Sequence, residues 1–190
     1  MPKIVDHEQY RKELLGKCFH LFAEKGYGAV TMRQIAQGLN VSTGTLYHYF
    51  PSKQALFEQL VEEISQQDVI TALAELGGKK NLSEMMVALG DYLVKNEDYL
   101  IKLTYVWVDF CQTQDSKTML SPSIVFQRAN KRYQQATCDV LGIEDKVLAS
   151  FVLSFVNGVI LEKLWGGETI DFLEQCELLG KMLTAYLQKN

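Results

Sequence analysis

The residues best placed for chemistry lie between positions 31 and 53, where short polar side chains alternate with apolar ones. The candidate contact positions in this segment are Thr31, Arg33, Gln34, Ser42, Thr43, Gly44, Thr45, Tyr47, His48 and Lys53. Their hydroxyl, amide, imidazole and cationic groups can donate hydrogen bonds to phosphate oxygens and to the edges of bases. Gly44 has no side chain, so a ligand can come close to the backbone there. These residue types predict contact with a nucleic acid.

Motifs for other chemistries are incomplete. Gly26 and Gly28 begin like a dinucleotide-binding fingerprint, but Thr31 stands where its third glycine belongs. Residues 77–80 lack the spaced first glycine and the Ser or Thr of a phosphate-binding loop, and neither G-x-S-x-G nor H-E-x-x-H occurs. The four cysteines lie far apart in the chain, so we expect reduced, mostly buried thiols rather than a zinc site or disulfides. We therefore expect no enzyme activity, no metal and no cofactor.

Composition favours a helical globular protein. The chain has 190 residues, of which 47% are hydrophobic and 22% are charged, and this excludes intrinsic disorder. Only three prolines occur, which favours an all-α fold over a β-sandwich. The net charge is −4, yet residues 1–60 carry seven Lys or Arg against five acidic residues. This local positive excess indicates an anionic partner for the N-terminal segment.

No segment predicts export or membrane insertion. The N-terminus lacks the apolar core of a signal peptide. The longest apolar stretch, residues 147–161, is interrupted by Ser150, Ser154 and Asn157 and is shorter than the roughly 20 residues that a bilayer span needs. We expect a cytoplasmic protein without a membrane partner.

Apolar spacing and capping residues predict about nine helices. Thr31 and Gln34 match a capping box, Asn40 suits a left-handed residue at a helix end, and Ser42 suits an N-cap. Leu46 and Phe50 are four residues apart and should face a core. The predicted helices are residues 6–25, 32–39, 43–50, 53–75, 82–95, 97–114, 123–141, 145–165 and 170–188. The second and third form a helix-turn-helix, an arrangement that places its second helix in the major groove of DNA.

Residues 31–57, TMRQIAQGLNVSTGTLYHYFPSKQALF, closely resemble the helix-turn-helix signature of the tetracycline-repressor-like (TetR) family of bacterial transcription regulators. The resemblance covers roughly residues 8–60. It implies a DNA-binding domain of residues 1–52 and a helical ligand-binding and dimerisation domain of residues 53–190. It also implies a homodimer on a near-palindromic operator in double-stranded DNA, released by a small-molecule effector. Lys53 is similar to the family's phosphate-contacting lysine.

The remainder of the chain offers candidates for a pocket and a dimer interface. The candidate lining of a mostly apolar pocket is Tyr92, Tyr105, Asp109, Phe126, Tyr133 and Phe151. Asp109 would either anchor a ligand or pair with a neighbour. The candidate interface combines small residues of one helix with apolar residues of the last, namely Ser150, Ser154, Gly158, Phe172, Cys176, Leu179 and Leu183. The alternative for this set is an intramolecular core.

The sequence therefore predicts an all-α, homodimeric, ligand-responsive DNA-binding repressor with an effector of unknown identity. An alternative is a helical protein-interaction module that has lost specific DNA binding, because the reading helix contains neither Arg nor Lys. Measured binding to specific DNA separates the two hypotheses.

Overall fold

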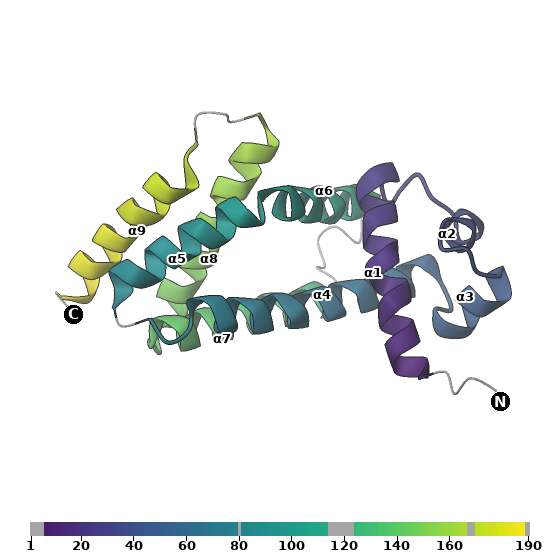
Figure 1. Cartoon of the computed structure of the whole chain (residues 1–190), viewed down its shortest axis with the longest axis horizontal. Helices are drawn as coiled ribbons and strands as arrows, with labels where there is room; N and C mark the ends of the chain where they lie inside the picture. Colours follow the sequence, from purple (N-terminus) through teal and green to yellow (C-terminus); the bar gives the residue numbers. More distant parts are fainter. Residues whose placement is uncertain (1–5, 80, 114–123, 167–169, 189–190) are drawn as a thin grey trace. The chain divides into compact units, whose positions relative to one another are not determined.

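The computed structural model describes residues 6–79, 81–113, 124–166 and 170–188, and all regular structure in these ranges is helical (Figure 1). The helices are α1 His7–Lys25, α2 Met32–Gly38, α3 Thr43–Tyr49, α4 Lys53–Leu76, α5 Leu82–Lys95, α6 Glu97–Thr113, α7 Ile124–Leu141, α8 Lys146–Leu164 and α9 Phe172–Leu187. Each predicted boundary agrees to within one or two residues. The all-α prediction is confirmed.

Local capping explains why the helices begin where they do. The carboxylate of Asp6 accepts hydrogen bonds from two backbone amides of the first turn of α1, and Asp145 and Asp171 do the same for α8 and α9. The side-chain oxygen of Asn81 accepts one such bond, from the backbone amide of Glu84, at the start of α5. Gly26, at φ 83°, ends α1 in a conformation that favours glycine. These short polar residues satisfy amide donors that a helix leaves free.

The described residues pack as two compact units. The first contains the described residues of 1–66 and 106–129, and the second contains those of 67–105 and 130–190. The boundaries fall inside α4, α6 and α7, so these three helices contribute residues to both units. We predicted a functional division after residue 52, and that division remains a prediction.

Aromatic side chains form the centre of the first unit. The rings of Phe57 and Phe110 stack with centroids 4.1 Å apart, and Phe22 meets Phe57 edge-on at 5.9 Å. Leu46 and Phe50 of the α3 region are fully buried, as their spacing predicted. This core fixes α3 against the rest of the unit and leaves its opposite side free.

The second unit depends on close contact between α5 and α9, which lie side by side in Figure 1. A side chain at Gly90 would lie 2.9 Å from a methyl of Leu173 and 3.3 Å from its Cα atom. A side chain at Gly180 would lie 2.9 Å from Cγ of Met86. Each helix therefore uses one glycine to admit a residue of the other.

Four residues that we assigned to a dimer interface belong to this core instead. Their exposed fractions are 2% for Phe172, 0% for Cys176, 1% for Leu179 and 2% for Leu183. They pack with residues of α5 and α8 in one apolar cluster. The intramolecular alternative is therefore correct for these four, because the close approach of α5 leaves no surface for a partner.

The surface of α8 is unusually apolar. Val147, Phe151, Ser154 and Gly158 are exposed and recur at intervals of four, three and four residues, so they share one face. Among the helices described, α8 is the one whose length and composition would allow it to cross a membrane, and 22% of its apolar window is buried.

The cysteines are all free. Cys18, Cys138 and Cys176 are buried, and Cys111 is exposed. Burial raises the pKa of the Cys18 thiol to about 12 and that of Cys176 to about 11. The prediction of mostly buried thiols is confirmed.

Candidate nucleic-acid interface

The capping box at the start of α2 forms as predicted. The backbone amide of Thr31 donates to Oε1 of Gln34 at 2.9 Å, and the amide of Gln34 donates to the Thr31 hydroxyl oxygen at 3.3 Å. The Thr31 hydroxyl also donates to Oε1 of Gln34 at 2.8 Å. The cap thus occupies much of the hydrogen-bonding capacity of these two residues. Arg33 between them is exposed and forms no ion pair within the described residues, so its guanidinium is available to a ligand.

The turn between α2 and α3 uses a left-handed residue. Asn40 has φ 56°, the conformation that we predicted for it, and its amide donates to the carbonyl of Gln37 at 3.1 Å. The next amide, of Val41, donates to the carbonyl of Ala36 at 3.0 Å. These bonds close α2 and redirect the chain into α3 within a few residues, which gives the compact helix-turn-helix.

The reading helix α3 has a buried side and an exposed side. Ser42 caps it by accepting from the Thr45 amide at 2.9 Å, and the two hydroxyls are themselves hydrogen-bonded at 2.8 Å. Thr43, Tyr47 and His48 are exposed. Their hydroxyl and imidazole groups supply the outward hydrogen-bonding capacity of this helix.

Gly44 is the position on α3 that a ligand can approach most closely. A Cβ atom at Gly44 would meet nothing nearer than the hydroxyl oxygen of Ser42 at 3.7 Å, which is ordinary van der Waals contact. The chain's own packing therefore does not require glycine here. Its small size instead leaves room for a molecule outside the chain.

Tyr49 packs against residues of α1. Its hydroxyl is hydrogen-bonded to Nδ1 of His7 at 2.8 Å, and its ring meets Tyr10 edge-on at 5.6 Å. The ring of His7 also lies 6.3 Å from that of His48. The sequence reasoning missed His7, because no spacing rule relates residues on separate helices.

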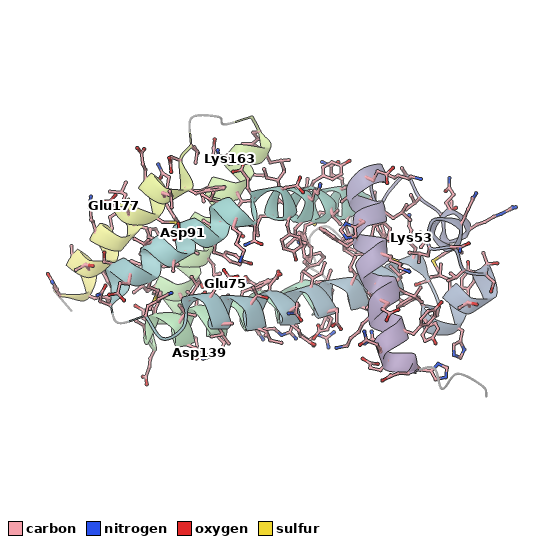
Figure 2. All side chains as sticks on the ribbon, in the orientation of Figure 1. Lys53, Glu75, Asp91, Asp139, Lys163 and Glu177 are labelled. Carbon is pink, nitrogen blue, oxygen red and sulfur yellow. The ribbon has the colours of Figure 1, made fainter. Side chains whose placement is uncertain are left out.

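Lys53, labelled in Figure 2, has an internal role that the sequence did not reveal. Its ammonium group donates to the carbonyls of Tyr27 and Val30, each at 2.9 Å, and lies 4.3 Å from the centroid of the Tyr27 ring. Burial lowers the pKa of Lys53, although the charge of Asp109 opposes that shift. Lys53 therefore fastens the loop between α1 and α2, and one ammonium hydrogen remains for the phosphate contact that we predicted.

Asp109 pairs internally. Its Oδ2 accepts a hydrogen bond from the backbone amide of Gly28 at 3.0 Å. Phe126 likewise belongs to the first unit, where its ring meets Trp107 at 5.1 Å. Both residues fill local roles in that unit, which explains their positions without a ligand.

The six predicted pocket residues are divided between the two units. Tyr92 and Tyr133 lie in the second unit with Tyr105 and Phe151, and the last two are exposed by 43% and 49%. Tyr133 instead donates its hydroxyl hydrogen to Asp68, a residue that the sequence reasoning did not select. Asp109 and Phe126 lie in the first unit, and a pocket lined by all six residues remains a prediction.

Arg11 and Lys12 make ordinary ion pairs. Arg11 contacts the carboxylate of Glu8 at 2.6 Å, and Lys12 contacts that of Glu63 at 3.1 Å. Hydrogen bonding from Arg11 lowers the pKa of Glu8. These cations are therefore committed to carboxylates, in contrast to Arg33.

Comparison with known proteins agrees with this geometry. Residues 14–60, which include the capping box, the turn and α3, match the model of the bacterial regulatory proteins of the tetR family. The helix-turn-helix segment of this chain is therefore similar to the DNA-binding segment of the TetR family. The matched segment is the one that carries the candidate contact positions.

Two curated relatives extend the comparison. The nucleoid occlusion factor SlmA of Haemophilus ducreyi is 25% identical over 186 residues, which is 97% of this chain and 80% of that protein. The transcriptional repressor Rv1474c of Mycobacterium tuberculosis is 33% identical over 93 residues, which is 48% of this chain and 49% of the repressor. The second match therefore spans about half of the repressor's length.

Solved structures share the fold of nearly the whole chain. A transcriptional regulator from Saccharomonospora viridis in complex with choline aligns with a TM-score of 0.67 at 18% identity, over 94% of this chain and 97% of that one. The regulator FadR from Bacillus subtilis in complex with stearoyl-CoA aligns with a TM-score of 0.65 at 14% identity, over 90% and 96%. At these identities the likeness establishes the fold.

Proposed function

We propose that this protein is a ligand-responsive, sequence-specific DNA-binding repressor of transcription of the TetR family. The observation that carries the proposal is the division of α3 into two sides. Leu46 and the adjoining Phe50 are fully buried, whereas Thr43, Tyr47 and His48 face solvent. A helix held by its core on one side and rich in hydrogen-bond donors on the other suits the major groove.

Phosphate attraction would come from few groups. Arg33 is exposed and free of ion pairs within the described part of the chain. The hydroxyl groups of α3 are neutral donors, so they add hydrogen bonds but no charge. We therefore expect moderate affinity for each half-site, so that stable binding requires two copies of α3.

We propose that a homodimer supplies the second copy. The exposed face of α8 contains Val147, at 80% exposure, and Phe151. On α9, Leu178, Met182 and Tyr186 are exposed and recur every four residues, so they also share one face. Apolar faces of this kind are suited to burial against another protein. A dimer with reading helices about 34 Å apart would select a near-palindromic operator in double-stranded DNA.

The effector is proposed to be a small molecule. The fold relatives include one regulator in complex with choline and another in complex with stearoyl-CoA, so effectors of different chemistry occur on this fold. We propose a cytoplasmic regulator with no catalytic activity, no cofactor and no membrane partner. A ligand that binds the DNA-free conformation better would shift the population away from DNA.

The test is fluorescence anisotropy of the purified protein with DNA fragments from upstream of its own gene, using scrambled DNA as competitor and a series of salt concentrations. We expect competitor-resistant binding of one dimer per near-palindrome and a linear log–log salt dependence. The variant Arg33→Ala should weaken binding and reduce the salt slope by about one. Lys25→Ala, at the end of α1, serves as a charge-matched control.

Binding no stronger to upstream DNA than to scrambled DNA would require genome-wide selection of bound fragments. If no fragment were enriched in that selection, the repressor proposal would be wrong. The helical protein-interaction module would then be the better description of this chain.

A further inference from the structure

A carboxylate held by two tyrosines lies in the second unit. The hydroxyl of Tyr99 on α6 donates to Oδ1 of Asp68 on α4 at 2.9 Å. The hydroxyl of Tyr133 on α7 donates to Oδ2 of the same carboxylate at 2.8 Å. Three helices thus direct polar groups to one point. Each carboxylate oxygen still has a lone pair that these two bonds do not use.

The charge of Asp68 is not neutralised by these neighbours. No Lys or Arg forms an ion pair with it among the described residues. Burial raises the pKa of Asp68, and the hydrogen bonds from Tyr133 and Tyr99 oppose that shift. Burial also raises the pKa of both tyrosines, with the charge of Asp68 adding to the effect, so they remain neutral donors. Phenol donors stabilise a carboxylate without cancelling its charge.

A second acidic residue on α4 is already paired with a lysine. Glu75, labelled in Figure 2, follows Asp68 by seven residues on α4 and pairs with Lys95 at 3.0 Å. The pKa of Tyr92 is raised to about 12 by burial, and the charges of Asp68 and Glu75 contribute.

The site is both open to solvent and adjacent to apolar surface. Asp68, Tyr92, Tyr99 and Tyr133 are each partly exposed. Tyr92 and the neighbouring side chains of Ala72 and Leu100 pack against the apolar core of the second unit. A ligand at the carboxylate would therefore also meet apolar groups.

We propose that Asp68, with Tyr92, Tyr99 and Tyr133, binds the cationic group of an organic ammonium compound that also has an apolar part. An ammonium cation supplies the charge that the partly desolvated carboxylate lacks. Aromatic side chains favour such cations further, because the ring faces attract positive charge. A neutral or anionic ligand would leave the carboxylate unpaired. The inference rests on the proposed function in one respect, namely that this ligand is the effector.

The test measures binding to the full-length protein in the absence of DNA. Choline and 3,3-dimethylbutan-1-ol have the same shape, and only choline is charged. Each is titrated by isothermal calorimetry into the wild type, Asp68→Asn and Asp139→Asn. Asp139 is exposed on α7 and bonds only to Gln135 among the described residues, so its variant matches the change in charge outside the site. Circular dichroism and thermal melting show whether each variant is folded.

We expect the wild type and Asp139→Asn to bind choline alike and to bind the neutral alcohol at least about tenfold more weakly. Asp68→Asn should lose at least about tenfold in affinity for choline. Equal binding of charged and neutral probes, no binding of either, or unchanged affinity in a folded Asp68→Asn would overturn the proposal. A variant Tyr133→Phe keeps the ring and removes one of the two donors that hold Asp68, so it should weaken choline binding and gives a second readout if Asp68→Asn does not fold.

A separate measurement distinguishes this inference from the proposed function. If choline binds at Asp68 and does not weaken DNA binding, the cation site is present and the effector role is wrong. If DNA binding fails for every fragment, the calorimetry still decides whether the site exists.

Discussion

At the scale of single residues, Gly44 is a position where one substitution should raise the stability of the fold and weaken DNA binding. A Cβ atom there would contact only the Ser42 hydroxyl oxygen at 3.7 Å, so Gly44→Ala is accommodated by the chain. Alanine in a helix is favoured over glycine by about 0.5–1 kcal/mol. We expect Gly44→Ala to raise the free energy of unfolding slightly and to weaken operator binding by about tenfold or more, equivalent to ~1.4 kcal/mol.

Gly16 provides the matched control for that prediction. It lies on α1, and a Cβ atom at its position would meet nothing within 4 Å. Gly16→Ala should give a similar gain in urea-denaturation stability and leave the anisotropy titration unchanged. If both variants bound DNA like the wild type, close approach at Gly44 would play no part in recognition.

The raised pKa of Asp68 leads to a prediction about how the free energy of unfolding depends on pH. Because burial raises its folded-state pKa above the unfolded value of about 3.9, the folded protein binds the Asp68 proton more readily than the unfolded chain does. The charged carboxylate therefore lowers the free energy of unfolding by its full amount at neutral pH. This cost decreases as the pH falls through the folded-state pKa. We expect Asp68→Asn to be more stable than the wild type at pH 7 and to lose that advantage towards pH 4.

Urea denaturation of both proteins across this pH range measures the difference. Asp139→Asn, which changes an exposed carboxylate, should show no comparable trend. An advantage of Asp68→Asn that grows as the pH falls would have the wrong sign for a raised pKa.

Residue types in the helix-turn-helix could be predicted because their roles are local. The capping box of Thr31 with Gln34 and the left-handed Asn40 depend on neighbours within a few positions. Asp68 could not be found in this way. Its partners lie 31 and 65 residues away in the sequence, and nothing in the local pattern relates them.

At the scale of helices, the contact between α5 and α9 depends on the absence of a side chain at Gly90. Valine there would come within 3.3 Å of the Cα atom of Leu173, which cannot move without its helix. We expect Gly90→Val to lower the free energy of unfolding by about 1–3 kcal/mol. Gly16→Val, at an open helical position, should change it by no more than about 0.5 kcal/mol.

Thermal and urea denaturation monitored by circular dichroism would compare the two variants. Equal stabilities would mean that α5 and α9 separate easily enough to admit the larger side chain. The helix boundaries could be predicted from the sequence, whereas the buried face of α9 was misassigned. Capping residues mark the ends of a helix, whereas the helix that covers an apolar stripe is decided by packing between distant segments.

At the scale of the whole molecule, the exposed apolar faces of α8 and α9 predict a homodimer. Phe151→Asp and Met182→Asp place a charge on residues that are 49% and 53% exposed in the single chain, so each variant should still fold. We expect each to raise the dimer dissociation constant by about a hundredfold, equivalent to ~2.7 kcal/mol. Val94→Asp, on α5 at 49% exposure, is the control.

Sedimentation velocity over a range of protein concentrations reports the outcome. A wild type that remains monomeric, or variants that dimerise as well as it does, would contradict the prediction. Dissolution of the wild type only in the presence of lipid or detergent would favour a membrane for α8. The sequence located the two apolar helices, but it could not distinguish the face used for the chain's own core from the face left to a partner.

The hydrogen bond from the Gly28 amide to Asp109 links the α1–α2 loop to α6, so hydrogen exchange at this amide should respond to a displacement of α6. The amide is shielded only while the carboxylate stays within bonding distance, now 3.0 Å. An effector that displaces α6 relative to this loop should therefore speed deuterium uptake at Gly28, while the helical amide of Gly38 serves as an internal reference. Unchanged uptake at Gly28 in the presence of an effector that releases DNA would show that the signal bypasses α6. Exchange of this one backbone proton would thus show whether displacement of α6 accompanies release of the operator.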